Sequence, residues 1–349
     1  MNETVRNHPP VTYPRDCWYV VATAAEVGYG FTARRILDTP VVLFRLSDGT
    51  IAALEDRCAH RPYPLSAGRR EDDFIVCGVH GCTYDATGRW VSVPSQDNPP
   101  SSARVRAFPV VERGPFVWIW AGTPGGERLR PPPATPWLHG DGWASVGERR
   151  EVAAGLPLLH EHYLDLSNVF AMHPEMVPPG IEALPPLEDV EVSEVSVSYQ
   201  RELPAAPLAP WEAAVTGLDD ATGSASFGRT ETGTFVTPGL HKQTYTIVGE
   251  TGPELELVRT HGFTPRSSGA THVFLQISWR GASVSPDVGE RLIEVFHAMA
   301  DRDVAVLETM QRCLDEDPVP RRYVNVKADR AAVRARRILT AMVEDERGI

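Results

Sequence analysis

Four residues in the first quarter of the chain carry the side chains that most clearly suggest chemistry. They are Cys58 and His60 in one short motif, and Cys77 and His80 in another, with residues 61–76 between them. The second motif continues into glycine, which tolerates the backbone conformations of a tight turn. Two thiolates and two imidazoles on two turns can together hold a metal centre. The identity of the metal decides whether the site transfers electrons or only stabilises the fold as a structural metal site.

The distribution of ligand types over the two motifs favours iron and sulfur over zinc. Structural zinc sites usually pair Cys with Cys and His with His at short spacing. Here each motif contributes one Cys and one His. A Rieske [2Fe–2S] centre needs two Cys on one iron and two His on the other, which suits mixed pairs on two loops. The sequence therefore predicts a [2Fe–2S] cluster bound by these four residues, and a zinc site is the alternative.

Composition narrows the class of protein. The chain has 349 residues, of which 42% are hydrophobic and 23% are charged, and its net charge is −12. An acidic chain argues against nucleic-acid binding, which rewards basic patches. No run of eighteen apolar residues is present and residues 1–8 lack the apolar core of a secretory signal, so we expect no membrane span and a cytoplasmic location. The remaining cysteines, Cys17, Cys82 and Cys313, are expected as reduced thiols, and a disulfide from Cys82 to Cys17 or Cys313 is the alternative.

The pattern of β-formers, prolines and helical periodicity predicts an α+β chain with two domains. Residues 1–130 read as an all-β domain, residues 131–136 as a proline-rich linker, and residues 137–349 as a mixed domain. The predicted strands of the first domain are 18–22, 41–45, 51–54 and 117–120. In the second domain we predict an antiparallel sheet from 192–201, 234–238, 243–249, 255–262 and 271–280, with helices over 158–172, 286–313 and 328–342.

Several segments of the amino-acid sequence resemble a known family. The resemblance is carried by residues 53–61, 64–68, 77–89, 108–113 and 117–120. These segments are similar to the Rieske domain of Rieske non-haem iron oxygenases, in the style of the vanillate O-demethylase and dicamba monooxygenase branch. The resemblance implies an N-terminal all-β Rieske [2Fe–2S] domain followed by a catalytic domain with a helix-grip-like antiparallel sheet.

The resemblance also implies a mononuclear iron, and here the chain departs from the family. The expected pattern is N-x2-D-x2-H-x4-H, with two His as iron ligands. Asp165 fits the Asp position and His173 the second His, but Asn168 stands where the first His is expected and His162 where the Asn is expected. Either His162 binds the iron, or Asn168 does so weakly, or the site is lost. The first arrangement requires the helix to break between His162 and His173, since they would otherwise lie about 16 Å apart.

The resemblance to the same family also implies a carboxylate ligand for the mononuclear iron and an Asp that links the cluster of one subunit to the iron of the next. The helical segment around residue 303 is similar to the family's, which places the ligand at Asp303 with Asp301 as runner-up. In the family, the Asp at position 165 links a cluster His of one subunit to an iron-ligand His of the next, so a homotrimer is implied. His160 is expected to be structural.

The implied function is that of a monooxygenase terminal component. It hydroxylates or oxidatively demethylates a small organic substrate with O2, using electrons from a separate NAD(P)H-dependent reductase or ferredoxin, because no dinucleotide-binding G-x-G-x-x-G motif follows a strand. The alternative is an electron-transfer or scaffold subunit, or a non-standard enzyme, with a lost or altered mononuclear iron site. Candidate pocket residues are Val169, Phe170, Met172, Phe235, His241, Phe274 and Trp279, with Arg259 and His261 as candidates for binding a carboxylate. The sequence does not identify the substrate.

Overall fold

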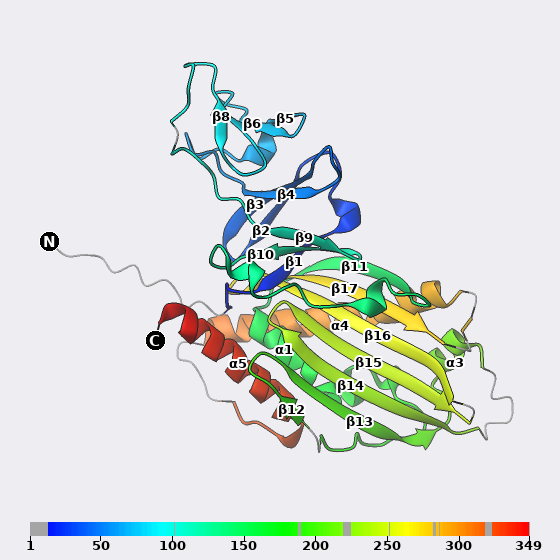
Figure 1. Cartoon of the computed structure of the whole chain (residues 1–349). Helices are drawn as coiled ribbons and strands as arrows, with labels where there is room; N and C mark the ends of the chain where they lie inside the picture. The colour runs from blue at the N-terminus through cyan, green and yellow to red at the C-terminus, as the bar shows by residue number, and fades with distance from the viewer. Residues whose placement is uncertain are drawn as a thin grey trace.

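The computed structural model describes residues 13–348 except 101, 188–189, 219–224, 251, 282–283, 286 and 318–322. Three small antiparallel sheets form the N-terminal part, which extends outward from one face of a single large sheet (Figure 1). The first contains β1 (Trp18–Thr23), β10 (Phe116–Trp120) and β9 (Val110–Arg113). The second contains β2 (Thr32–Ile36), β3 (Thr39–Arg45) and β4 (Ile51–Glu55). The outermost contains β5 (Arg69–Glu71), β6 (Phe74–Val76), β7 (Thr83–Tyr84) and β8 (Trp90–Ser92).

A seven-stranded antiparallel sheet dominates the second half of the chain. Its order is β11-β17-β16-β15-β14-β13-β12. The strands are β11 (Ala144–Val152), β12 (Val190–Val192), β13 (Val197–Ala206), β14 (Phe227–Thr237), β15 (Leu240–Gly249), β16 (Gly252–Ser267) and β17 (Ala270–Arg280). Because side chains alternate along a strand, each strand presents one row of residues to the helices and one to the opposite face.

The N-terminal sheets that contain β1 and β2 pack against that opposite face. Gly262 lies so close to β1 that an added Cβ would stand 2.8 Å from the Val20 side chain, so the glycine permits the close approach. The hydroxyl of Thr264, two residues further on, donates a hydrogen bond to the backbone carbonyl of Val20. The even-numbered residues of β16 thus face the N-terminal part, and its odd-numbered residues face the helices.

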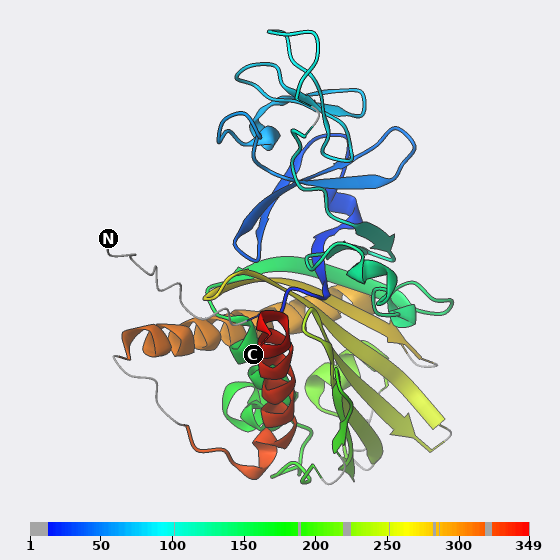
Figure 2. The same ribbon diagram turned by 60° about the vertical axis from the view of Figure 1, so that its left-hand side comes forward.

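Helices cover the other face of the large sheet (Figure 2). They are α1 (Leu156–Leu164), α2 (Val169–Met172), α3 (Pro210–Thr216), α4 (Val288–Glu316) and α5 (Arg330–Arg347). The buried side of α4 carries Val288, Leu292, Phe296, Met299, Ala300, Asp303 and Leu307. Apolar residues at helical spacing explain why this side faces the sheet. Asp303 is the charged residue within it, so its burial needs a chemical reason.

The predicted α+β class is confirmed, with the β-rich domain first and the antiparallel sheet second. The predicted helix 158–172 was wrong as one element, since α1 ends at Leu164 and a separate short helix begins at Val169. The predicted strand 192–201 spans the turn between β12 and β13. Strand β11 and helix α3 were not predicted, and Pro286, the predicted start of α4, lies outside the described residues. The domain boundaries at 130 and 136 stay a prediction.

Two further findings concern the whole chain. None of the described helices combines the length and apolar character needed to cross a membrane. All five cysteines are free thiols, so the alternative of a disulfide at Cys82 was wrong.

Candidate functional site

Two hairpin loops at the tip of the N-terminal part bring the four predicted cluster residues together. The backbone amide of Cys77 donates to the carbonyl of Cys82 at 2.9 Å and that of Cys58 donates to the carbonyl of Tyr63 at 2.9 Å, which closes each loop. The ring centroids of His60 and His80 are 4.5 Å apart. Cys58 and Cys77 are buried, His60 is half-buried and His80 is exposed. The thiols therefore point inward and the imidazoles lie toward solvent.

The surroundings of the thiols favour a bound thiolate. The hydroxyl of Tyr84 lies 3.2 Å from Sγ of Cys58. Burial opposes ionisation of Cys58, but this hydroxyl and the backbone amides of His60 and Arg61 outweigh it, so the pKa of Cys58 is lowered. Burial and the neighbouring Cys58 raise the pKa of Cys77. Nδ1 of His60 is buried without a hydrogen-bond partner among the described residues, as expected of a nitrogen that ligates iron. The residues fit a [2Fe–2S] cluster.

A break in the chain after α1 shapes the second site. Asp165, with φ −104° and ψ 97°, leaves the helical conformation and ends α1. Its side chain accepts a hydrogen bond from the amide of Ser167 at 2.9 Å, which starts a 3₁₀ turn over residues 166–168 before α2. His173 ends α2 and also leaves the helical conformation. The turn folds the chain back, so His162 and His173 both reach α4 despite their separation in sequence.

Asp303 of α4 joins these two histidines. Its Oδ1 lies 3.0 Å from Nε2 of His162 and 2.9 Å from Nε2 of His173. The side chains of His162, His173 and Asp303 are 7%, 3% and 8% exposed. Burial would raise the pKa of Asp303, but the two imidazoles hold it well below its usual range. Asp301, the runner-up, is 73% exposed and pairs with Arg150 on the surface.

These three side chains fit a single ion. Two neutral imidazoles and one carboxylate on one side of a metal make the 2-His-1-carboxylate set of non-haem Fe(II) sites. Among the described residues, no group of three or more His, Cys, Asp or Glu side chains has the arrangement of a metal-coordination shell, and Asp303 contacts both imidazoles directly. Adjacent ligands of an octahedral ion, each about 2.1 Å from it, lie roughly 3 Å apart, which agrees with both separations. Nδ1 of His173 is buried and lacks a partner among the described residues.

A cavity of about 90 Å³ adjoins His173. Asn168 and Val169 line one side of it, and the side chain of Asn168 makes no capping hydrogen bond to α2. Much of the remaining wall is apolar or aromatic, from Met176, Leu203, Trp211, Tyr245, Phe296 and Met299. Arg259 and Glu231 supply charge to it. The arrangement can hold a small, mainly apolar ligand beside the three ligating side chains.

The structure places the predicted pocket residues in different parts of the fold. Val169 lines the cavity, Phe170 lines a separate groove, and Met172, Phe235 and His241 are absent from the described lining of the cavity. Phe235 and His241 are fully buried and pack near His160, whose ring centroid is 4.6 Å from that of Phe235. The sequence does not show how far along the sheet the cavity lies. The cavity residues Trp211 and Tyr245 were missed because nothing in the local sequence distinguishes them from core aromatics.

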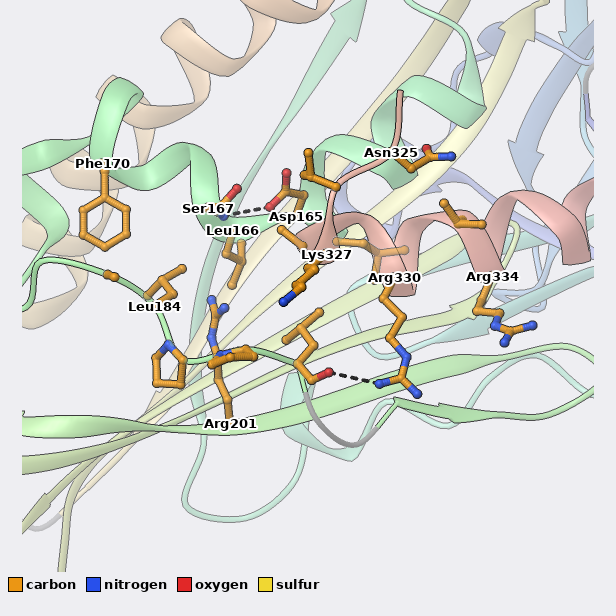
Figure 3. A pocket seen from close by; sticks show the side chains of 18 of the residues that line it. Asp165, Leu166, Ser167, Phe170, Leu184, Arg201, Asn325, Lys327, Arg330 and Arg334 are labelled. Atoms are coloured by element: carbon orange, nitrogen blue, oxygen red, sulfur yellow. Dashed lines mark hydrogen bonds between the residues drawn. The ribbon is translucent and has the colours of Figure 1, made fainter. Parts of the chain in front are cut away.

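Asp165 lines a different space, an open groove of about 770 Å³ (Figure 3). Its floor and sides include residues 182–187 and 325–328 and the basic side chains of α5, such as Arg334. Asp165 accepts a hydrogen bond from the amide of Ser167 in its own turn, and no hydrogen bond between Asp165 and His162 or Asn168 occurs among the described residues. The predicted bond between Asp165 and an iron ligand of the same chain is thus not present in this arrangement.

Comparison with known proteins identifies both parts of the chain. Residues 17–109 match the Rieske [2Fe-2S] domain, and residues 152–345 match the vanillate O-demethylase oxygenase C-terminal domain. The first match confirms the predicted cluster type and removes the zinc alternative.

Similar proteins include an iron-sulfur subunit of a monooxygenase system and an oxygenase component of a demethylase. The toluene-4-sulfonate monooxygenase system iron-sulfur subunit of Comamonas testosteroni is 35% identical over 46% of this chain and 46% of that protein. The dicamba O-demethylase oxygenase component of Stenotrophomonas maltophilia is 37% identical over 47% and 48%. The aligned part of the chain thus spans about half the length of these relatives.

Similarity to a solved structure extends over nearly the whole chain. The crystal structure of dicamba monooxygenase bound to 3,6-dichlorosalicylic acid superposes with a TM-score of 0.86 and 26% sequence identity, covering 96% of this chain and 99% of that one. The N-terminal cluster loops, the helix-covered antiparallel sheet and the family match over more than half of the chain are consistent with one another. The chain therefore belongs to the vanillate O-demethylase oxygenase family of Rieske proteins.

Proposed function

We propose that this chain is the terminal oxygenase component of a Rieske non-haem iron monooxygenase. It would hydroxylate or oxidatively demethylate a small organic substrate, with electrons supplied by a separate NAD(P)H-dependent reductase or ferredoxin. The observation that carries the proposal is the contact of Asp303 Oδ1 with both His162 and His173 beside an apolar cavity. The names of the similar oxygenase components support the same reaction class.

The cluster residues have distinct roles in this proposal. The buried Cys58 and Cys77 would hold one iron of the cluster, and the more exposed His60 and His80 would hold the other. The cluster would supply one-electron transfer. The lowering of the Cys58 pKa by the Tyr84 hydroxyl and nearby backbone amides favours the thiolate form that would bind iron.

We assign the mononuclear iron to His162, His173 and Asp303, with Asn168 outside the ligand set. A ferrous ion in this set supplies the activation of dioxygen. Each imidazole presents Nε2 to the same carboxylate oxygen, whereas the amide of Asn168 borders the cavity. An amide oxygen is also a harder and weaker ligand for Fe(II) than an imidazole. Although His and Asn have exchanged positions 162 and 168, the proposed ligand set still consists of two His and one Asp. Only the position of one His in the sequence differs from the family pattern.

We further propose that the chain works as a homotrimer in a reducing, cytoplasmic compartment. Asp165 supports the first part, because it borders an open groove and lies only three residues from His162. A cluster His of a second copy seated in this groove would come close to the iron site through Asp165. The three cysteines outside the cluster, Cys17, Cys82 and Cys313, are free thiols, which is compatible with a reducing compartment.

Iron content tests the ligand assignment. Purified chain should contain about three irons, two in the cluster and one mononuclear. His162→Ala should reduce this to about two, with the visible spectrum of the cluster unchanged, and should abolish turnover. Asn168→Ala is the matched control and should keep about three irons.

Two results would contradict the assignment. If His162→Ala keeps its third iron while Asn168→Ala loses it, Asn168 is the ligand. If the unmodified chain, reconstituted with Fe(II), holds only two irons, it is an electron-transfer or scaffold subunit and not an oxygenase.

A further inference from the structure

A third buried thiol lies beside the two cysteines assigned to the cluster. Cys58, Cys77 and Cys82 belong to one group of packed side chains in the N-terminal part, where they are 5%, 1% and 0% exposed. The cluster takes two of these thiols, so the proposed function leaves Cys82 unused. A buried cysteine can serve simply as a small apolar side chain. The position of Cys82 relative to Cys58 gives it a further chemical role.

The hairpin of β6 and β7 places Cys82 opposite Cys77. Val76 pairs with Thr83 in register at the end of the hairpin. The amide of the next residue, Cys77, donates a 2.9 Å hydrogen bond to the carbonyl of Cys82. Both side chains are buried, so they point to the same side of the hairpin. The hairpin therefore presents two neighbouring thiols to the loop that carries Cys58.

The loop that carries Cys58 covers this side of the hairpin. Cys82 and Tyr84 are two residues apart at β7 and both buried, so their side chains face the same way. The Tyr84 hydroxyl lies 3.2 Å from Sγ of Cys58 and accepts a 3.1 Å hydrogen bond from the amide of Ala59. Cys58 also interacts with the thiols of both Cys77 and Cys82. The three thiols therefore share one buried space.

We propose that Cys82 forms a reversible disulfide with Cys58 when hydrogen peroxide destroys the cluster, and so protects this ligand from irreversible oxidation. The released Cys58 thiolate attacks peroxide, whose O–O bond breaks to give a sulfenic acid and hydroxide. The Cys82 sulfur then attacks the sulfenic sulfur, an S–S bond forms, the S–O bond breaks and water leaves. Two thiols lose two electrons and two protons, and one peroxide becomes two waters. A dithiol reductant reverses the disulfide by exchange.

Exposure and ligation decide which thiols react. Cys58 is the most exposed of the three, so peroxide reaches it first. Cys77 shares its iron with Cys58, whereas Cys82 binds no iron and is available as soon as Cys58 is released. Without Cys82, the sulfenic acid meets a second peroxide and becomes a sulfinic acid, which thiols do not reduce. This inference rests on the assignment of Cys58 as a cluster ligand in the proposed function, and it does not involve the mononuclear iron.

Peptide mapping after peroxide treatment tests the proposal. The cluster-loaded full chain is treated with hydrogen peroxide until its visible absorbance is lost, and free thiols are then alkylated before digestion with trypsin. Cys58 lies in the peptide 58–69, because trypsin does not cleave before Pro62, and Cys77 and Cys82 share the peptide 71–89. We expect a disulfide from Cys58 to Cys82, an alkylated Cys77, and a fall from five to three free thiols per chain.

Cys82→Ala is the informative variant, and Cys17→Ala is the matched control. Cys17 is also buried, but it packs in a separate group of side chains. After peroxide, followed by dithiothreitol, iron and sulfide, the unmodified chain and Cys17→Ala should regain most of the visible circular dichroism of the cluster. Cys82→Ala should regain roughly five times less, with two added oxygen atoms on the peptide of Cys58. Cys82→Ser replaces it if the alanine variant takes up no cluster before the treatment.

Three outcomes would overturn the proposal: a disulfide of Cys77 with either neighbour, no loss of free thiols in the unmodified chain, or equal recovery of the cluster in Cys82→Ala and the unmodified chain. Failure of the proposed function is seen separately. It would appear as a missing third iron before peroxide is added, and it would leave the disulfide and the recovery unchanged.

Discussion

The chemistry of this chain depends on single side chains whose neighbours tune them. Asp303 is the clearest case, since a carboxylate on the apolar side of a helix is costly unless it is paired, and two imidazoles pair it here. At the cluster, the corresponding neighbour is Tyr84, whose hydroxyl contacts Cys58. Hydrogen bonds to the sulfurs are among the factors that set the reduction potential of an iron–sulfur centre.

Removing the Tyr84 hydroxyl should lower the reduction potential of the cluster. A donor to a sulfur ligand stabilises the more negative, reduced state, so its loss in Tyr84→Phe should cost about 1 kcal/mol, or on the order of 40 mV for one electron. Redox titration followed by visible circular dichroism measures the shift.

Tyr63→Phe is the control for this change. The Tyr63 hydroxyl donates to the carbonyl of Ala67 at 3.4 Å and not to a sulfur. An equal shift in both variants, or an unchanged potential in Tyr84→Phe, would show that the contact with Cys58 does not tune the cluster.

At the scale of elements, short segments hold the cavity wall in place. Helix α3 carries Trp211 and begins with a cap in which Oε2 of Glu212 accepts from the amide of Ala209 at 2.7 Å. Glu212 also pairs with Arg229 of β14 at 2.6 Å, and both side chains are fully buried. Tyr245 of β15 donates to the same carboxylate at 2.6 Å. One carboxylate therefore ties a short helix to two strands beside the cavity.

Removing one partner of the buried Glu212–Arg229 ion pair should destabilise the fold. Arg229→Met leaves a buried carboxylate without its cation, so we expect a loss of roughly 3 to 5 kcal/mol in the free energy of unfolding. The double variant Arg229→Met with Glu212→Gln should lose less than Arg229→Met alone, because no charge remains unpaired. Chemical denaturation followed by far-ultraviolet circular dichroism gives the values, and strict additivity of the two single changes would contradict the coupling.

At the scale of the whole molecule, the cluster and the candidate iron site belong to different parts of one chain. The cluster loops lie near β6 and β8 at the tip of the N-terminal part, whereas α1 and α4, which carry His162 and Asp303, lie against the large sheet (Figure 1). The proposed ring would place the cluster of one copy against Asp165 of the next.

Mixed assemblies test this arrangement. A chain with Cys58→Ser lacks a cluster ligand, and a chain with Asp303→Asn lacks the iron carboxylate, so each alone should be inactive. Co-expressed with different affinity tags and purified through both tags, the mixture should regain a substantial fraction of activity, because an intact cluster then faces an intact iron site.

The control for the mixture is a third chain that carries both substitutions. Paired with either single variant, it cannot supply the missing partner and should give no activity. Light scattering should give a mass about three times that of one chain. A monomeric mass, or no recovery in the mixture, would contradict electron transfer between subunits.

The sequence by itself determined the cluster, because its ligands lie within two short loops whose residue types and spacing are local properties. It also determined the α+β class and many of the strands, since alternation is readable along the chain. It left His162 and Asn168 as alternatives, because a helix break at Asp165 decides which side chain reaches α4, and such a break depends on packing. The tertiary structure alone brought Asp303 to His162 and His173. These contacts join residues far apart in sequence, so only the folded chain brings their charges together.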